Sequence, residues 1–212
     1  MLQRASSYEP ELQAAIAAVV RDGWTCADVG AHYGVFTRLL AELVGETGRV
    51  VAFEAHPRNA RRLRRSLSAR SRSRVTVENV AVTDGASERV TLHRGRGRAS
   101  AEWNIIGADV EGRPTPAALE VRATSLDSYF AGRSLHFAKL DVEGAEASVL
   151  RGMRRLLRES NPILAIEFHT ETGWAGRNEL LDAGYQLQTV AGEPIDAGPG
   201  AQRVYHCLAH PA

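Results

Sequence analysis

Short apolar runs alternate with amphipathic stretches along most of the chain. The runs TCADVG (25–30) and RVVAFEA (49–55) are brief and bounded, as is typical of strands buried on both faces of a parallel sheet. Each run precedes a stretch with helical spacing, at 33–45 and at 57–67. The same order recurs in two later pairs, which are 136–144 with 145–160, and 163–169 with 172–184.

The remaining runs complete an α/β pattern. A helix is expected at 8–23 and a strand at 74–83, and the alternating runs 185–192 and 203–210 suit an antiparallel pair. We therefore predict a doubly wound, Rossmann-like α/β sheet that is mostly parallel, with an antiparallel C-terminal strand and helices on both faces. In such a sheet the ligand lies at the carboxyl ends of the strands, where the winding reverses.

One segment interrupts this alternation. About fifty residues separate the strand runs 74–83 and 136–144, which is too long for an ordinary crossover connection. We predict that residues 85–133 form an insertion, in which short strands at 88–94 and 119–126 fold over the sheet as a β-rich cap. The 212 residues show no internal repeat or low-complexity linker, so we expect a single domain, 1–212.

Composition and charge narrow the class of protein. The formal net charge of +1 gives no overall attraction to nucleic acid or anionic lipid. The arginine-rich stretch 57–74 has no interleaved aromatic residues for base stacking, so we expect a solvated helix face and no nucleic-acid partner. Cys26 and Cys207 are expected to be buried, reduced thiols. Because no run approaches the roughly 20 apolar residues that span a bilayer, we predict a cytoplasmic protein without a membrane partner.

The loop after the first strand indicates the class of ligand. Gly30 and Gly34 leave the GxGxxG pattern of a dinucleotide site incomplete, because His32 and Val35 occupy its other two glycine positions. The GKS or GKT ending of a phosphate loop is absent as well. The loop suits an amino-acid carboxylate at a helix N-terminus, such as that of S-adenosylmethionine. Asp28 can accept backbone N–H groups here or bind the cationic amine of the methionine part.

An acidic residue on the second strand supports this ligand. Glu54 follows Gly34 by twenty positions, which is the spacing at which a carboxylate reaches the hydroxyls of a bound ribose. A carboxylate can accept hydrogen bonds from both hydroxyls at once. The expected cofactor is therefore S-adenosyl-L-methionine.

These motifs, taken together, resemble a known family. The segments DVGAHYGVFT, VVAFEAHPRN, VENVAVTD, TSLDSYF, FAKLDVEGAEASVLRGM and PILAIEFH resemble, in that order, the FkbM family of S-adenosylmethionine-dependent methyltransferases. The resemblance runs from about Cys26 to His169. It implies a class I methyltransferase fold and, most often, O-methylation of sugars, polyketides or other specialised metabolites. This chain has His32 where the family commonly has asparagine.

The resemblance also implies which residues surround the cofactor. Carried over position by position, it places Asp28, Gly30, Ala31 and Gly34 around the methionine part, and Glu54 on the ribose. Asn79 and Val80 are expected beside the adenine, because an amide can pair with its edge and a branched apolar residue can pack on its face. For Asn79 the alternative is a turn residue.

Chemistry is expected at the next two strand ends. Methyl transfer is an in-line displacement at a sulfonium, so the enzyme positions the acceptor and can remove its proton. His169 is predicted as the general base, since an unperturbed pKa near 6.5 leaves neutral imidazole available, with a helix-capping role as the alternative. Asp141 is expected to contact the cofactor or fix the acceptor, and Glu143 is the third catalytic candidate.

Several alternatives remain open at this stage. Asp141, Glu143, Glu167 and His169 could hold Mg²⁺ or Mn²⁺, but no spacing establishes this and we predict no metal. The expected activity is O-methylation of a small-molecule acceptor, and N-methylation of a peptide or amide is the nearest alternative. A nicotinamide-dependent oxidoreductase shares the fold but requires the missing glycines. A non-catalytic nucleotide-binding module could use the arginine-rich helix.

Overall fold

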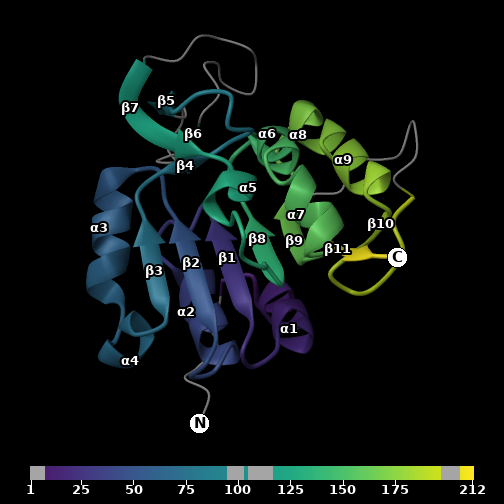
Figure 1. Ribbon diagram of the computed structural model, residues 1–212, viewed down its shortest axis with the longest axis horizontal. Coiled ribbons are helices and arrows are strands. Elements are labelled where there is room, and N and C mark those ends of the chain that lie inside the picture. Colours follow the sequence, from purple (N-terminus) through teal and green to yellow (C-terminus); the bar gives the residue numbers. More distant parts are fainter. Residues whose placement is uncertain (1–7, 95–102, 105–116, 197–205) are drawn as a thin grey trace.

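A computed structural model describes residues 8–94, 103–104, 117–196 and 206–212 (Figure 1). Its main sheet has seven strands. One of them, β11 (His206–Pro211), runs antiparallel to both of its neighbours, and the other strand pairs are parallel. This confirms the predicted mostly parallel sheet with an antiparallel C-terminal strand. The strands in spatial order are β3 (Val75–Glu78), β2 (Arg49–Phe53), β1 (Thr25–Val29), β8 (Phe137–Leu140), β9 (Ile163–Glu167), β11 (His206–Pro211) and β10 (Tyr185–Gln188).

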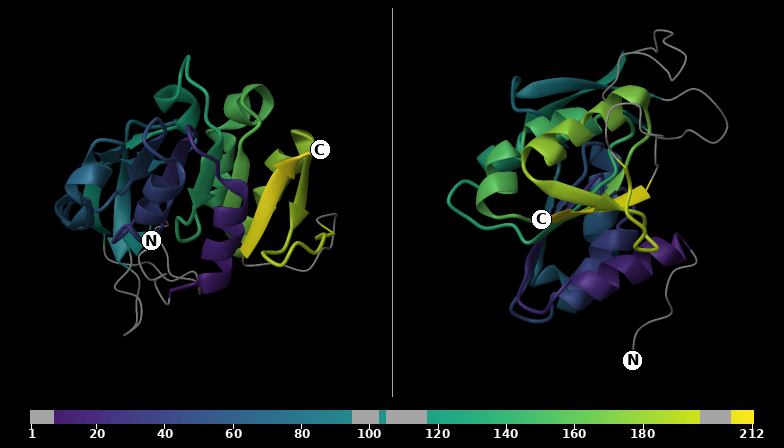
Figure 2. Two further views of the ribbon diagram at one scale, coloured as in Figure 1. Left: turned by 90° about the horizontal axis from the view of Figure 1, so that it is seen from below. Right: turned by 90° about the vertical axis from the view of Figure 1, so that its right-hand side faces the viewer.

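Helices cover both faces of this sheet, as Figure 2 shows. Successive residues of one strand enter opposite cores: Val50 and Ala52 face one helix layer, whereas Val51 and Phe53 face the other. The first core contains residues from α1 (Pro10–Val19), α2 (Val35–Leu43) and α3 (Pro57–Ser66), and α3 is followed by α4 (Ala69–Arg72). The second core is covered by α5 (Leu126–Tyr129), α6 (Glu146–Arg151), α7 (Arg154–Glu159), α8 (Glu171–Ala175) and α9 (Arg177–Asp182).

Two helices that the sequence predicts as continuous are each divided at a glycine. The stretch 145–160 breaks between α6 and α7 at Gly152, where a Cβ would lie 2.1 Å from the carbonyl oxygen of Thr83. The stretch 172–184 breaks between α8 and α9 at Gly176, where a Cβ would lie 2.6 Å from the Cα of Ala147. Close backbone contact therefore overrides helical periodicity at both positions. No helix in the described ranges has the length and apolar character needed to cross a membrane.

A second sheet has the strand order β4-β7-β5-β6 and contains the described strands of the predicted insertion. Its strands are β4 (Ala81–Val82), β5 (Arg89–Arg94), β6 (Trp103–Asn104) and β7 (Ala117–Thr124). The prediction of one strand at 74–83 is wrong, because that run is divided between β3 of the main sheet and β4 of the second sheet. β5 and β7 are antiparallel and correspond to the two strands expected in the insertion. Figure 1 shows this sheet beyond the carboxyl ends of the main strands. Residues 95–102 and 105–116 of the predicted insertion lie outside the described residues.

Both thiols are buried, one in each core, as predicted. Burial raises the pKa of Cys26 and of Cys207 to about 12, and only the thiolate is a good nucleophile. We therefore expect Ellman's reagent at pH 8 to label the folded protein roughly 100-fold more slowly than the urea-unfolded protein. Rapid release of two equivalents of the chromophore from folded protein would contradict this expectation.

Candidate active site

A cavity lies at the carboxyl ends of β1, β2 and β8, where the winding of the main sheet reverses. Its wall includes the residues that come directly after these strands in sequence. They are Gly30 after β1, Glu54 after β2, and Asp141 and Glu143 after β8. Leu92 of the second sheet lies in the same wall. Glu54, Asp141 and Glu143, which were predicted from separate sequence motifs, therefore line one cavity, whereas His169 is not part of its lining.

Gly30 allows the ends of β1 and β8 to meet. Its φ is +83°, and a Cβ at this position would lie 1.7 Å from the carbonyl oxygen of Asp141. The N–H groups of Gly30 and Ala31 both donate to the carbonyl of Phe53, each at 3.0 Å, which attaches β2 to the same loop. Gly34 serves a different contact, because a Cβ there would lie 2.1 Å from Leu63 Cδ1. Of the two loop glycines, Gly30 lies in the cavity wall and Gly34 packs against α3.

Glu54 presents a fixed carboxylate to the cavity. The backbone N–H of His32 donates to Oε2 at 2.7 Å, and the N–H of His56 donates to Oε1 at 2.8 Å. Burial of this side chain, which is 7% exposed, raises its pKa, and the two backbone donors act in the opposite direction. Each oxygen retains acceptor capacity for another hydroxyl. Because His32 contributes a backbone group, this contact does not depend on the side chain at position 32.

Three other predicted cofactor residues lie behind the cavity wall. Asp28 is 1% exposed, and its Oδ2 accepts a hydrogen bond from the Thr37 hydroxyl of α2. Ala31 is buried in the first core. The amide nitrogen of Asn79 donates to the carbonyls of Glu54 (2.9 Å) and Ala55 (2.8 Å), so both of its N–H bonds are used. These residues hold the strand ends in place, and direct cofactor contacts from them stay a prediction. Val80, in contrast, lies in the cavity wall.

A buried lysine is part of the same framework. Lys139 is 2% exposed, and its ammonium lies 2.5 Å from Asp141 Oδ2 and 4.5 Å from the centre of the Phe36 ring. It is paired in register with Asp28 across β1 and β8. Burial raises the pKa of Asp28, and the charge of Lys139 counteracts that rise. No role was predicted for Lys139 from the sequence, although a single charge within the apolar run FAKL was an available signal.

His169 lies among four carboxylates. Its Nδ1 is 2.9 Å from Glu146 Oε1, and its Nε2 is 3.4 Å from Glu167 Oε1, 3.5 Å from Asp141 Oδ1 and 3.7 Å from Glu143 Oε2. Burial alone would lower the pKa of His169, but these carboxylates outweigh it and raise the pKa to about 11. The prediction of a general base assumed a neutral imidazole. A raised pKa favours the protonated ring, which donates hydrogen bonds, so the role of His169 as a general base stays a prediction.

Glu143 has a backbone conformation that is uncommon for a side-chain-bearing residue. Its φ is +51°, and the following Gly144 has a φ of +99°. His32, across the cavity wall, also has a positive φ, of +46°. Such conformations persist only where surrounding contacts hold them, and they are frequent at functional sites. Here the turn after β8 directs the Glu143 carboxylate to the cavity wall.

Two groups of three side chains in the described part of the chain come close enough to share a metal ion. One consists of Asp141, Glu143 and His169, and the other of Glu9, Glu167 and His206. In each group the donor atoms lie within 4.8 Å of one another. The first group includes three of the four residues considered from the sequence. The second was not considered, because Glu9 and His206 are far apart in sequence and only the fold brings them together.

Residues 28–187 match the methyltransferase FkbM domain. None of the curated proteins matches the chain. Among solved structures, a methyltransferase FkbM from Methylobacillus flagellatus is 21% identical, with a TM-score of 0.59, over 91% of this chain and 45% of that one. The present chain therefore spans less than half of the Methylobacillus protein.

Other solved structures share the fold, and their names indicate different methyl acceptors. An S-adenosylmethionine-dependent O-methyltransferase from Thermotoga maritima is 16% identical, with a TM-score of 0.51, over 96% of this chain and 65% of that one. An rRNA methylase from Streptococcus thermophilus is 14% identical, with a TM-score of 0.53, over 99% of this chain and 96% of that one. At these identities the likeness concerns the fold, and it confirms the predicted class I architecture.

Proposed function

The chain belongs to the methyltransferase FkbM domain family, and from this membership we propose that it transfers the methyl group of S-adenosylmethionine to a hydroxyl oxygen of a small molecule. The observation that carries the proposal is one cavity with the buried carboxylate of Glu54, held by two backbone N–H groups, on one side. Two further carboxylates, Asp141 and Glu143, lie on the other side. The expected cofactor position therefore lies next to the expected acceptor position, at the place where the strand order of the sheet reverses.

The cavity suits the cofactor in charge and in hydrogen-bonding capacity. S-Adenosylmethionine, when bound, supplies a methyl group on a cationic sulfonium. Glu54 would accept from the ribose hydroxyls, and Val80 with Phe53 would pack against the adenine. Gly30 would leave room for the methionine part, whose positive charges the carboxylate of Asp141 would stabilise.

In this proposal the acceptor's proton moves to Glu143. Asp141 is held between the ammonium of Lys139 and the imidazole of His169, so it is suited to position a hydroxyl. Glu143 Oε2 lies 3.7 Å from His169 Nε2, and Glu143 lines the cavity. A proton-accepting carboxylate at this place matches what attack by an alcohol requires. His169 then acts by positioning both carboxylates.

The charge of the acceptor side supports a small, unphosphorylated acceptor. Asp141 and Glu143 would repel the phosphates of a nucleic acid, whose binding depends on cationic contacts. Leu92 adds apolar surface from the second sheet. We propose that residues 85–133 form the acceptor cap of a single methyltransferase domain.

The proposal is tested by an acceptor screen with methyl-labelled S-adenosylmethionine. Sugars and polyketide alcohols form one set, and amide-containing peptides and ribosomal RNA form two others. Label in an ether linkage of a small alcohol is the expected result. Label recovered on nitrogen, or in RNA alone, would replace the proposed acceptor class, and tight binding of NADH without any transfer would replace the activity.

Glu54→Gln is expected to weaken binding of S-adenosylhomocysteine by about 1.5–3 kcal/mol, which is the range for hydrogen bonds to a charged group. The variant keeps the size of the side chain but replaces one acceptor oxygen with a donor. Isothermal titration calorimetry measures the change. Glu42→Gln, at an exposed position of α2, is the control and should bind as the wild type does. Equal affinity in both variants would remove Glu54 from the ribose site.

A further inference from the structure

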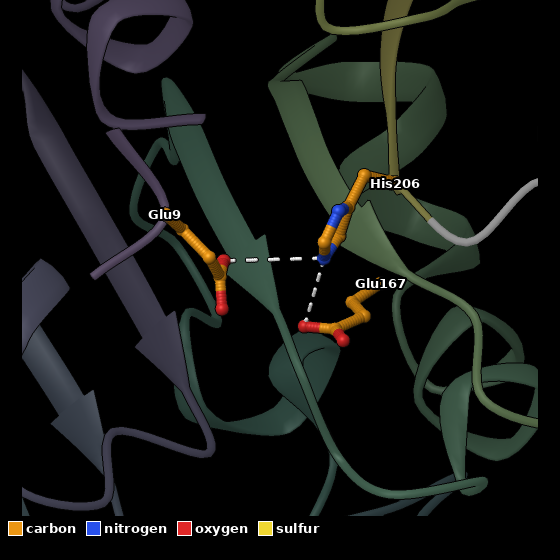
Figure 3. Close-up of side chains that lie close together, drawn as sticks. All are labelled: Glu9, Glu167 and His206. Atoms are coloured by element: carbon orange, nitrogen blue, oxygen red, sulfur yellow. Dashed lines mark ion pairs between the residues drawn. The ribbon is translucent and has the colours of Figure 1, made fainter. Parts of the chain in front are cut away.

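A second polar cluster adjoins the active site and uses residues from three separate elements. Glu9 precedes α1, Glu167 ends β9 and His206 begins β11. His206 Nε2 lies 3.2 Å from Glu167 Oε2 and 3.9 Å from Glu9 Oε2. Figure 3 shows the imidazole nitrogen directed between the two carboxylates. We call Glu9, Glu167 and His206 the β11 cluster.

In the described part of the chain, two buried atoms at the centre of the β11 cluster have ion-pair neighbours but no hydrogen bond of good geometry. They are Glu9 Oε2 and His206 Nε2, the same atoms that face each other in Figure 3. Buried polar atoms are nearly always hydrogen-bonded, so an exception calls for another partner. A cation between these two atoms would be a partner for both of them.

We propose that the β11 cluster binds a divalent transition-metal ion, Zn²⁺ or Mn²⁺, through Glu9 Oε2, Glu167 Oε2 and His206 Nε2. Zinc lies about 2.0–2.2 Å from nitrogen and oxygen ligands, so two ligands of one ion lie roughly 3–4 Å apart. The distances of 3.2 and 3.9 Å fall in this range. An imidazole among the ligands favours these metals over Mg²⁺ and Ca²⁺, which prefer oxygen.

The other metal-compatible group is a poorer site. In that group Asp141 already has the ammonium of Lys139 at 2.5 Å. One imidazole nitrogen of His169 is engaged by Glu146 at 2.9 Å. A cation there would compete with a resident positive charge, whereas no lysine or arginine of the described residues forms an ion pair with the β11 cluster.

A metal in the β11 cluster would also influence the active site through Glu167. One oxygen of this carboxylate faces His206, and the other lies 3.4 Å from His169. Fixing Glu167 would therefore fix the orientation of His169, which contacts Asp141 and Glu143. The same ion would attach the segment before α1 to the sheet. Its role is to position these groups, independently of which acceptor is methylated.

The test uses tag-free protein that has been dialysed against EDTA and then titrated with ZnCl₂ and, separately, MnCl₂. We expect one equivalent to bind, with a rise in Tm that EDTA reverses. His206→Ala should weaken zinc affinity at least about 100-fold, because it removes a direct ligand. Glu9→Gln also removes a ligand, but Glu9 precedes α1 and is not in the sheet, so this variant keeps the test available if His206→Ala fails to fold. His210→Gln, on the same strand, is the control and should bind normally.

Two results would overturn the proposal. One is the absence of stoichiometric binding, with the Tm unchanged by either metal salt. The other is stoichiometric binding that survives both His206→Ala and Glu9→Gln but is lost in Glu143→Gln, which would place the ion at Asp141, Glu143 and His169. Both readouts are measured without acceptor, so they are independent of the proposed methyl transfer.

Discussion

Glu143→Gln is expected to lower kcat by about 10²–10⁴, which is the usual contribution of a general base. The amide keeps the shape of the side chain but cannot accept the acceptor's proton at neutral pH. S-Adenosylhomocysteine affinity should stay within about threefold of wild type, because Glu54 and Gly30 form the other side of the cavity. Single-turnover methyl transfer and calorimetry measure the two quantities separately.

The matched control is Glu171→Gln, an exposed carboxylate in the first turn of α8. It should leave kcat unchanged. Asp141→Asn is expected to lose both rate and cofactor affinity, since Asp141 lies between Lys139 and the cavity. If Glu143→Gln retains the wild-type kcat while Asp141→Asn is inactive, the proton acceptor is Asp141 or solvent, and Glu143 has no role in the chemical step.

Much of the fold follows from local pattern. Runs such as TCADVG and RVVAFEA are short and apolar because they are buried on both faces, and β1 and β2 appear where they were expected. The spacing of Gly30 and Glu54 places both at adjacent strand ends, so the cavity could be located from sequence. The breaks at Gly152 and Gly176 could not, because each depends on a distant backbone segment that approaches the helix.

The chemistry of individual side chains was harder to predict, for an electrostatic reason. His169 was assigned a role from its ordinary pKa, but that value depends on which charges surround the ring after folding. Glu146 and Glu167 come from different elements, and their combined effect raises the pKa of His169. Burial likewise decides the importance of Lys139, since the same residue on a surface strand would be an ordinary solvated charge.

Lys139→Met is expected to destabilise the protein by about 3–5 kcal/mol, the cost of removing one partner from a buried ion pair. Methionine fills a similar volume and can still pack on Phe36, so the loss is mainly one of charge. It leaves Asp28, which is 1% exposed, and Asp141 without their buried cation. Urea unfolding measures the change. The control is Arg70→Met, whose pair with Glu46 has side chains 76% and 80% exposed and should contribute little.

A second substitution separates charge from packing. In the double variant Lys139→Met with Asp28→Asn, the deeply buried carboxylate opposite Lys139 on β1 becomes neutral. If uncompensated charge causes the instability, the double variant should be more stable than Lys139→Met alone by about 1–2 kcal/mol. Additive losses from the two substitutions would instead mean that the charge of Lys139 does not stabilise Asp28. The instability of Lys139→Met would then come from Asp141, the ion-pair partner at 2.5 Å, which loses its cation in the same variant.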